Sequence, residues 1–159
     1  MSATDDDLSI ATVYAAEDGV QELLRRGGIV DFYGTTLDLA QNRVRSFEQW
    51  QLPFMQAMIE ALYQKHRAGG PVVGPVLRES KKAGHPHYRP GKHEIVLPSQ
   101  AVYWTDLVLC HELAHALTPD SSGGNRAAHD LAWRRTYCAL VSEVVGREAS
   151  MLLQSALNL

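Results

Sequence analysis

The chain has 159 residues, of which 45% are apolar and 21% are charged, and its formal net charge is −3. This length suits one domain with a substantial core, and the slightly acidic balance argues against binding to nucleic acid or to anionic membranes. The acidic N-terminus is unlike a signal peptide, no apolar run is long enough for a membrane span, and two cysteines are too few for a disulfide framework. We therefore expect a cytoplasmic protein with one domain over residues 8–159, preceded by a disordered tail over residues 1–7.

The first seventy residues predict a mixture of short strands and helices. Residues 9–14 and 29–39 are rich in β-prone side chains, whereas residues 17–26 have a helical pattern that two glycines end. A longer amphipathic helix is expected over residues 46–66, with Pro53 either delaying its start or kinking it. Its apolar positions are most simply explained as a core face: Phe47, Trp50, Phe54, Met58, Ala61 and Leu62.

The next part of the chain predicts strands, and the last part predicts helices. The expected strands are residues 72–73, 76–77, 86–88 and 93–97. The turn Pro90-Gly91-Lys92 indicates that the last two strands form a hairpin. The expected helices are residues 105–117, 128–145 and 148–156, with a flexible loop over residues 120–126. Strands followed by helices are typical of the α+β class.

One segment carries a pattern with a specific chemistry, His111-Glu112-Leu113-Ala114-His115, or H-E-x-x-H. On a helix the two histidines share one face about one turn apart, so both imidazoles can bind the same Zn²⁺ ion. Glu112 lies next to the first of these ligands and could reach a water molecule at the metal without binding the metal itself. The pattern therefore indicates a zinc site in which Glu112 acts as general base for hydrolysis.

A catalytic zinc ion generally has three protein ligands, so a third residue has to join the pair. His129 is the best candidate, while Asp130 is a neighbouring alternative and Glu143 a more distant one. Tyr137 could donate a hydrogen bond to a developing oxyanion, although packing in the core is the simpler explanation for it. A second group of histidines beside the expected hairpin could contact a substrate or act as an auxiliary ligand, but the simpler interpretation is ordinary exposed residues that flank turns: His85, His87 and His93.

These motifs resemble those of a known family. The run H-E-L-A-H-A-L-T-P at residues 111–119, followed by H-D-L-A-W at residues 129–133, is similar to small actinobacterial HEXXH-motif metallohydrolases and to SprT-like minimal zincin metalloprotease domains. The similarity extends from about Val72 to the C-terminus. It implies a zincin-like fold in which a small, mostly antiparallel sheet packs on the active-site helix and helices follow. It also implies a peptide or protein substrate, and a strand near residues 93–97 that borders the cleft, where an extended peptide could add by strand pairing.

The resemblance further implies that His111, His115 and His129 are the zinc ligands and that Glu112 is the general base. Asp130 stands where the SprT-like pattern has glycine, so Asp130 stays an alternative for the third ligand. Two cysteines cannot form the four-cysteine zinc ribbon that often follows SprT-like domains, so nothing supports a role directed at DNA.

Two functional hypotheses follow from these observations. The first is a zinc metallopeptidase, in which residues 118–125 could close over the substrate. The second is a non-catalytic zinc-binding structural or interaction protein that keeps the H-E-x-x-H site. The sequence specifies neither the substrate nor the oligomeric state.

Overall fold

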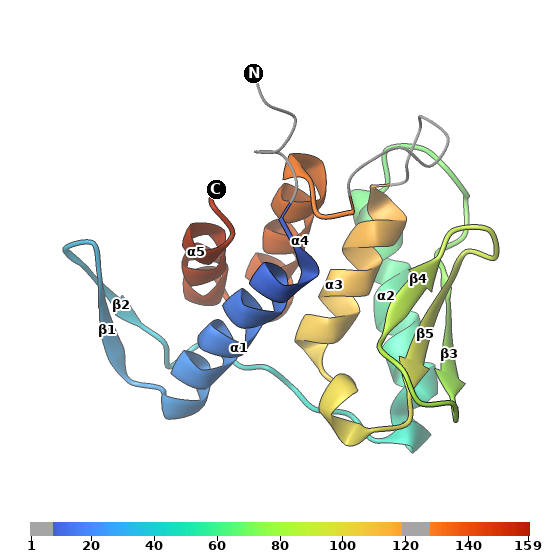
Figure 1. The fold of residues 1–159 in the computed structure, drawn as a ribbon, viewed down its shortest axis with the longest axis horizontal. Coiled ribbons are helices and arrows are strands. Elements are labelled where there is room, and N and C mark those ends of the chain that lie inside the picture. Colours follow the sequence, from blue (N-terminus) through green and yellow to red (C-terminus); the bar gives the residue numbers. More distant parts are fainter. Residues whose placement is uncertain (1–7, 119–127) are drawn as a thin grey trace. The chain divides into compact units, whose positions relative to one another are not determined.

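The computed structural model describes residues 8–118 and 128–159, and within them the chain is of the α+β class, as predicted (Figure 1). The predicted tail over residues 1–7 and the predicted loop over residues 120–126 lie outside the described residues. The elements in chain order are α1 (Ile10–Arg26), β1 (Ile29–Phe32), β2 (Thr35–Asp38), the 3₁₀ helix η2 (Gln49–Gln51), α2 (Leu52–His66), β3 (Val76–Ser80), β4 (His87–Arg89), β5 (Glu94–Pro98), the 3₁₀ helix η3 (Ala101–Tyr103), α3 (Asp106–Leu117), α4 (Leu131–Val144) and α5 (Arg147–Ala156).

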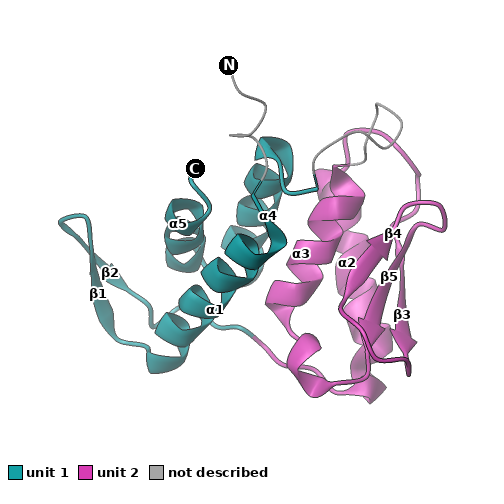
Figure 2. Ribbon diagram, viewed as in Figure 1, with its two compact units in different colours: residues 1–44, 122–159 teal, residues 45–121 magenta. Residues whose placement is uncertain are grey.

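The chain divides into two compact units (Figure 2). The first consists of residues 1–44 and 122–159 and contains α1, the β1–β2 pair, α4 and α5. The second consists of residues 45–121 and contains α2, α3 and the sheet formed by β3, β4 and β5. The expectation of one domain over residues 8–159 stays a prediction.

Helix α1 begins where the sequence predicted a strand. The Ser9 hydroxyl accepts a hydrogen bond from the Thr12 amide at 3.2 Å, which caps the helix at its start. Its buried side chains Val13, Ala16 and Val20 follow one another at spacings of three and four. The strand predicted over residues 9–14 is therefore wrong, because the cap and this apolar stripe extend the predicted helix by about two turns towards the N-terminus.

Strands β1 and β2 form the antiparallel hairpin that the β-prone residues 29–39 predicted in part. The two residues of the turn, Tyr33 and Gly34, both have positive φ angles, as a two-residue hairpin turn that matches the strand twist requires. The Tyr33 hydroxyl lies 3.2 Å from Ser155 Oγ on α5, which ties the tip of the hairpin to that helix.

Helix α5 receives its N-terminal cap from a distant residue. Gly146 occupies the N-cap position and has no side chain to offer, so the Asn42 side chain supplies the acceptor instead. Asn42 Oδ1 accepts a hydrogen bond from the Ala149 amide at 2.8 Å, and its amide group donates to Glu148 at 3.0 Å. A Cβ atom at position 146 would collide with Asn42, which explains why glycine separates α4 from α5.

The sheet of the second unit has the strand order β3-β5-β4. Strand β5 lies in the centre, pairing in parallel with β3 and antiparallel with β4. The sheet is therefore mixed: the expected antiparallel pairing and hairpin hold for β4–β5 but not for β3–β5. The expectation that an extended peptide could pair with the strand near residues 93–97 is wrong, because β5 has a neighbouring strand on each side. The short strand expected at residues 72–73 does not form either.

Helix α2 starts later than the predicted residue 46, and Pro53 is the reason. Proline fits the first turn of a helix, where its missing amide hydrogen is not needed, so Leu52 begins the α-helix and η2 precedes it. Its buried residues are Met55, Ile59, Leu62 and Tyr63. The predicted core face is confirmed for Phe47 and Leu62, which are buried, but it is wrong for Trp50 and Phe54, which are 75% and 52% exposed. Met58 is half-buried, and Ala61 is exposed.

Helix α3 covers almost the range that the sequence predicted, from the Thr105 cap to Leu117. Asp106, in its first turn, is completely buried and accepts hydrogen bonds from Arg45. The Arg45 main-chain amide and Nε both lie 3.0 Å from Oδ2, and Nη2 lies 3.3 Å from Oδ1. The same guanidinium lies over the rings of Phe47 and Phe54, at 5.5 and 5.9 Å from their centroids. These contacts hold the start of α3 against the segment that leads into α2.

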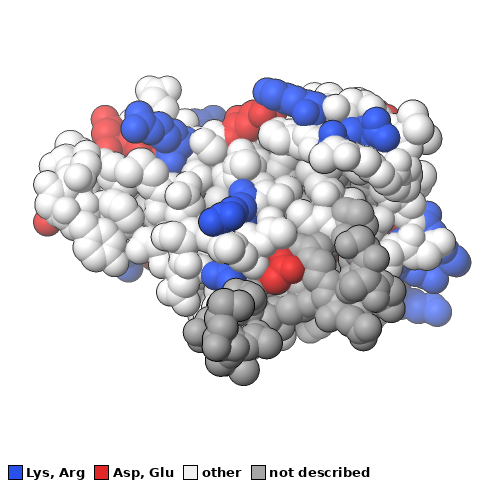
Figure 3. All heavy atoms as spheres, turned by 90° about the horizontal axis from the view of Figure 1, so that it is seen from above, with Lys and Arg blue, Asp and Glu red and all other residues white. Residues whose placement is uncertain are grey.

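On the face drawn in Figure 3, lysine, arginine and acidic side chains all occur, separated by wide stretches of uncharged residues. Among the described residues, no helix is both long and apolar enough to cross a membrane.

We predict that D106N destabilises the protein by about 1–3 kcal/mol, because an amide accepts hydrogen bonds from a guanidinium more weakly than a carboxylate does and its NH₂ group meets the same donors. Urea unfolding followed by circular dichroism measures the change. The control is E22Q, which removes the exposed ion pairs of Glu22 with Arg25 and Arg26 and should barely shift the urea midpoint. An unchanged midpoint for D106N would contradict the role given to Asp106.

Candidate metal centre

Helix α3 places the two histidines of the H-E-x-x-H motif beside each other, as its periodicity predicted. His111 and His115 lie one turn apart, and their ring centroids are 5.2 Å from each other at an interplanar angle of 60°. His111 is buried and His115 is half-buried. Most of the other buried side chains of α3 are apolar, so the two imidazoles project from a helix that is mainly packed in the core.

His129 lies two residues before α4, in a segment that several contacts hold in place. Asp130 caps the helix, with its carboxylate accepting a hydrogen bond from the Trp133 amide at 3.0 Å. The Trp133 ring meets the His129 ring edge-on, with 4.5 Å between centroids. The buried Arg134 side chain donates from Nε to the His129 carbonyl at 3.2 Å. The backbone and the ring of His129 are therefore both constrained by residues of α4.

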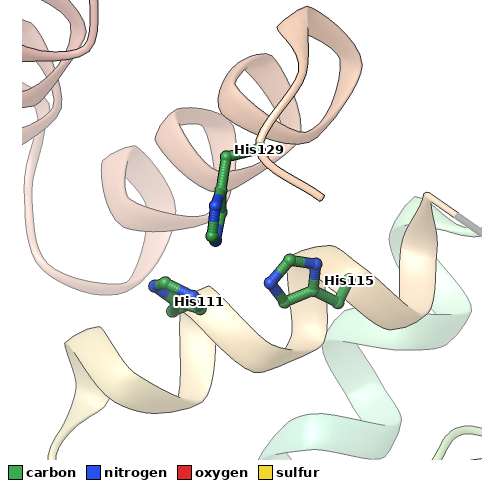
Figure 4. A group of neighbouring side chains, drawn as sticks. All are labelled: His111, His115 and His129. Atoms are coloured by element: carbon green, nitrogen blue, oxygen red, sulfur yellow. The ribbon is translucent and has the colours of Figure 1, made fainter. Parts of the chain in front are cut away.

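One nitrogen atom from each of His111, His115 and His129 lies within 4.8 Å of the other two, and the three rings point toward one another (Figure 4). Tetrahedral zinc with Zn–N bonds of about 2.0–2.1 Å needs nitrogen–nitrogen separations of about 3.3–3.4 Å. Three imidazoles also match the ligand chemistry of zinc and related transition metals. The buried three-histidine group could therefore bind a metal ion.

Glu112 is buried beside this group but is not one of its members. Its Oε2 atom lies 3.9 Å from Nε2 of His111. The carboxylate that the sequence predicts to be a general base therefore lies beside an imidazole of the group, and its catalytic role stays a prediction.

Asp130 and Glu143, the two alternatives to His129 as the third ligand, do not belong to the three-histidine group. Asp130 uses its carboxylate as the N-cap of α4, and Glu143 is exposed in the last turn of the same helix. Among the described residues, the group that could hold a metal ion contains neither of them.

Tyr137 is completely buried, and its hydroxyl donates a 2.6 Å hydrogen bond to the Glu17 carboxylate of α1. A hydroxyl has one proton to donate, so in this arrangement Tyr137 does not offer it to a substrate oxyanion. Its ring packs on Trp133 with 4.9 Å between centroids. Sequence reasoning missed Glu17, and no local pattern identifies it because its partner lies 120 positions later in the chain.

Of the second histidine group, His93 has a structural role. Burial, together with neighbouring Tyr63, raises the pKa of Tyr88 to about 12, so that hydroxyl stays protonated and can donate to His93 Nδ1 at 2.7 Å. Nε2 of His93 then carries the proton that bonds to the Val73 carbonyl at 2.8 Å. His93 thus connects β4 and the segment before β3 through both ring nitrogens.

Cys138 is a packing residue of α4. Burial raises the pKa of its thiol to about 12, although the charge of Arg134 acts in the opposite direction. The thiol therefore stays protonated near neutral pH and is a poor nucleophile or metal ligand there.

A scan against protein-family models, a search of curated proteins and a search of solved structures each find no match. The resemblance to SprT-like domains therefore stays a prediction, which rests on residues 111–119 and 129–133.

We predict that H129A lowers the affinity for Zn²⁺ by more than about 100-fold, because the loss of a direct ligand should exceed the 10–100-fold effect typical of residues behind the ligands. Competition with a chromogenic chelator measures the dissociation constant. The matched control is H87A, which removes an exposed histidine outside the group and should leave the affinity unchanged. If H129A binds zinc with wild-type affinity, His129 is not the third ligand, and Asp130 or Glu143 becomes the candidate.

Proposed function

We propose that this protein is a zinc-dependent metallohydrolase, and more specifically a peptidase that cleaves amide bonds. The observation that supports this most is the meeting of His129 with His111 and His115 while the buried Glu112 lies beside them. Three imidazoles leave one position of a tetrahedral metal for water or substrate, and a neighbouring carboxylate that is not a ligand is suited to general-base catalysis.

His111, His115 and His129 are the residues that would hold the ion. When bound, zinc would supply a Lewis acid that polarises the scissile carbonyl and makes water more acidic. The choice of zinc over other metals rests on the neutral, nitrogen-only ligand set and on the H-E-x-x-H spacing.

Glu112 has the proton-transfer role in this proposal. It removes a proton from water as the water oxygen adds to the carbonyl carbon of the substrate. It then gives that proton to the amide nitrogen, the C–N bond breaks, and an acid and an amine result. The burial of Glu112 suits this task, because few solvent molecules compete for the proton.

An extended peptide is the substrate form that the sheet suggests. Strand β5 has both of its sides occupied, whereas β4 lies at an end of the strand order and packs against α3. The outer side of β4 is therefore where we propose that a peptide backbone pairs, next to the helix that carries Glu112.

The burial of the site favours a second candidate function. His111 and His129 are each only 4% exposed, as a closed structural zinc site would require. In that case a group other than water would occupy the fourth position, and the ion would stabilise an interaction module. The visible spectrum of a Co²⁺-substituted protein distinguishes the two, because an added small anion alters the spectrum only when a coordination position is open.

We predict that E112Q retains wild-type zinc affinity but hydrolyses a fluorogenic peptide library at least about 100-fold more slowly, because glutamine cannot accept the proton from water. The release of fluorescence by zinc-loaded protein measures the rate. The control E22Q changes an exposed glutamate of α1 and should retain the full rate. If E112Q cleaves the library as fast as the wild type, Glu112 is not the base.

A further inference from the structure

We propose that Arg134 is a positioning residue for His129, and that it sets the metal affinity of the three-histidine group through the main chain of that ligand. The inference rests on the proposed function in so far as His129 is a metal ligand. It adds a residue that no sequence motif of the site contains.

Arg134 is an arginine in an unusual place, because only 2% of it is exposed although it carries a permanent charge. Nε donates to the His129 carbonyl at 3.2 Å, and Nη1 donates to the Leu157 carbonyl at 2.8 Å. Leu157 is the C-cap residue of α5, so one guanidinium joins the segment before α4 to the end of α5.

The hydrogen bond to His129 falls where the helix itself offers no support. Asp130 already caps α4, and the regular hydrogen bonding of the helix starts at its carbonyl, which accepts from the Arg134 amide at 3.0 Å. The His129 carbonyl lies outside that pattern and accepts from Arg134 Nε and, at 3.4 Å, from the Leu8 amide. Without the guanidinium, the main chain at His129 would lose the shorter of these two hydrogen bonds.

Arg134 and Trp133 contact different parts of His129. The Trp133 ring contacts the imidazole directly, whereas the Arg134 guanidinium fixes the peptide group from which that side chain projects. A buried guanidinium is costly unless good acceptors surround it, so packing alone would favour leucine or methionine at this position. The geometry therefore assigns Arg134 to holding the His129 peptide in place.

The test compares R134M and R134K with the full-length wild type. We expect R134M to weaken zinc binding by about 10–100-fold, as is typical of residues that hold a ligand in place. It should also shift the visible spectrum of the Co²⁺ form. R134K should recover part of the affinity, because an ammonium group can still donate to one carbonyl.

The matched control is S150A, which removes another buried hydrogen bond to a main-chain carbonyl, from Ser150 Oγ to Cys138 at 2.7 Å. S150A should lower the melting temperature without changing zinc affinity or the Co²⁺ spectrum. If R134M and R134K both bind zinc like the wild type, or if S150A weakens binding as much as R134M does, the positioning role is wrong. If R134M does not fold, the zinc affinity of R134K is compared with that of the wild type, and equal affinities mean that the positioning role is wrong.

Amide hydrogen exchange in the metal-free protein separates this inference from the proposed function. The exchange rates of residues 128–131 should rise in R134M and R134K but not in S150A. If the wild type binds no zinc while these rates still rise, the proposed function fails and the restraint on His129 stands. If the wild type binds zinc and the rates are unchanged, the inference about Arg134 fails alone.

Discussion

The hydrogen bonds between Arg45 and the buried carboxylate of Asp106 hold the start of the helix that carries the motif. A carboxylate without solvent needs donors, and Arg45 supplies them from its main chain and its guanidinium. Because a helix is rigid over two turns, fixing Asp106 also fixes where His111 and His115 project. The chemistry of α3 therefore depends on a residue that lies 61 positions earlier in the chain and takes no part in the proposed reaction.

The parts of the fold that could be predicted are those that neighbouring residues determine. The limits of α3 follow from the Thr105 cap, and the pairing of His111 with His115 follows from helical spacing. The errors arise where two local signals compete. In residues 9–14, β-prone side chains outweighed the Ser9 cap, and in α2 the aromatic stripe outweighed the effect of Pro53 on the start of the helix. In both cases the signal at the helix end determined the structure.

The parts that could not be predicted are contacts between residues far apart in sequence. His129 was a candidate because of its residue type, but the Arg134 guanidinium that holds its carbonyl belongs to no motif. The hydroxyl of Tyr137 was open to a catalytic role until the structure placed the Glu17 carboxylate beside it. One sequence contains no signal for such pairs, since each partner alone has an ordinary local environment.

The cap that Asn42 provides for α5 has a consequence for how the protein folds. Residues 45–121 are continuous in sequence, whereas the first unit combines residues 1–44 with residues 122–159. The Ala149 amide at the start of α5 can bond to Asn42 only when a loop of about a hundred residues has closed. This closure lowers the conformational entropy of the chain before the hydrogen bond can stabilise it. During synthesis α1 and the β1–β2 hairpin are made before α4 and α5, so the contacts within the first unit can form only after residues 45–121 have also been made.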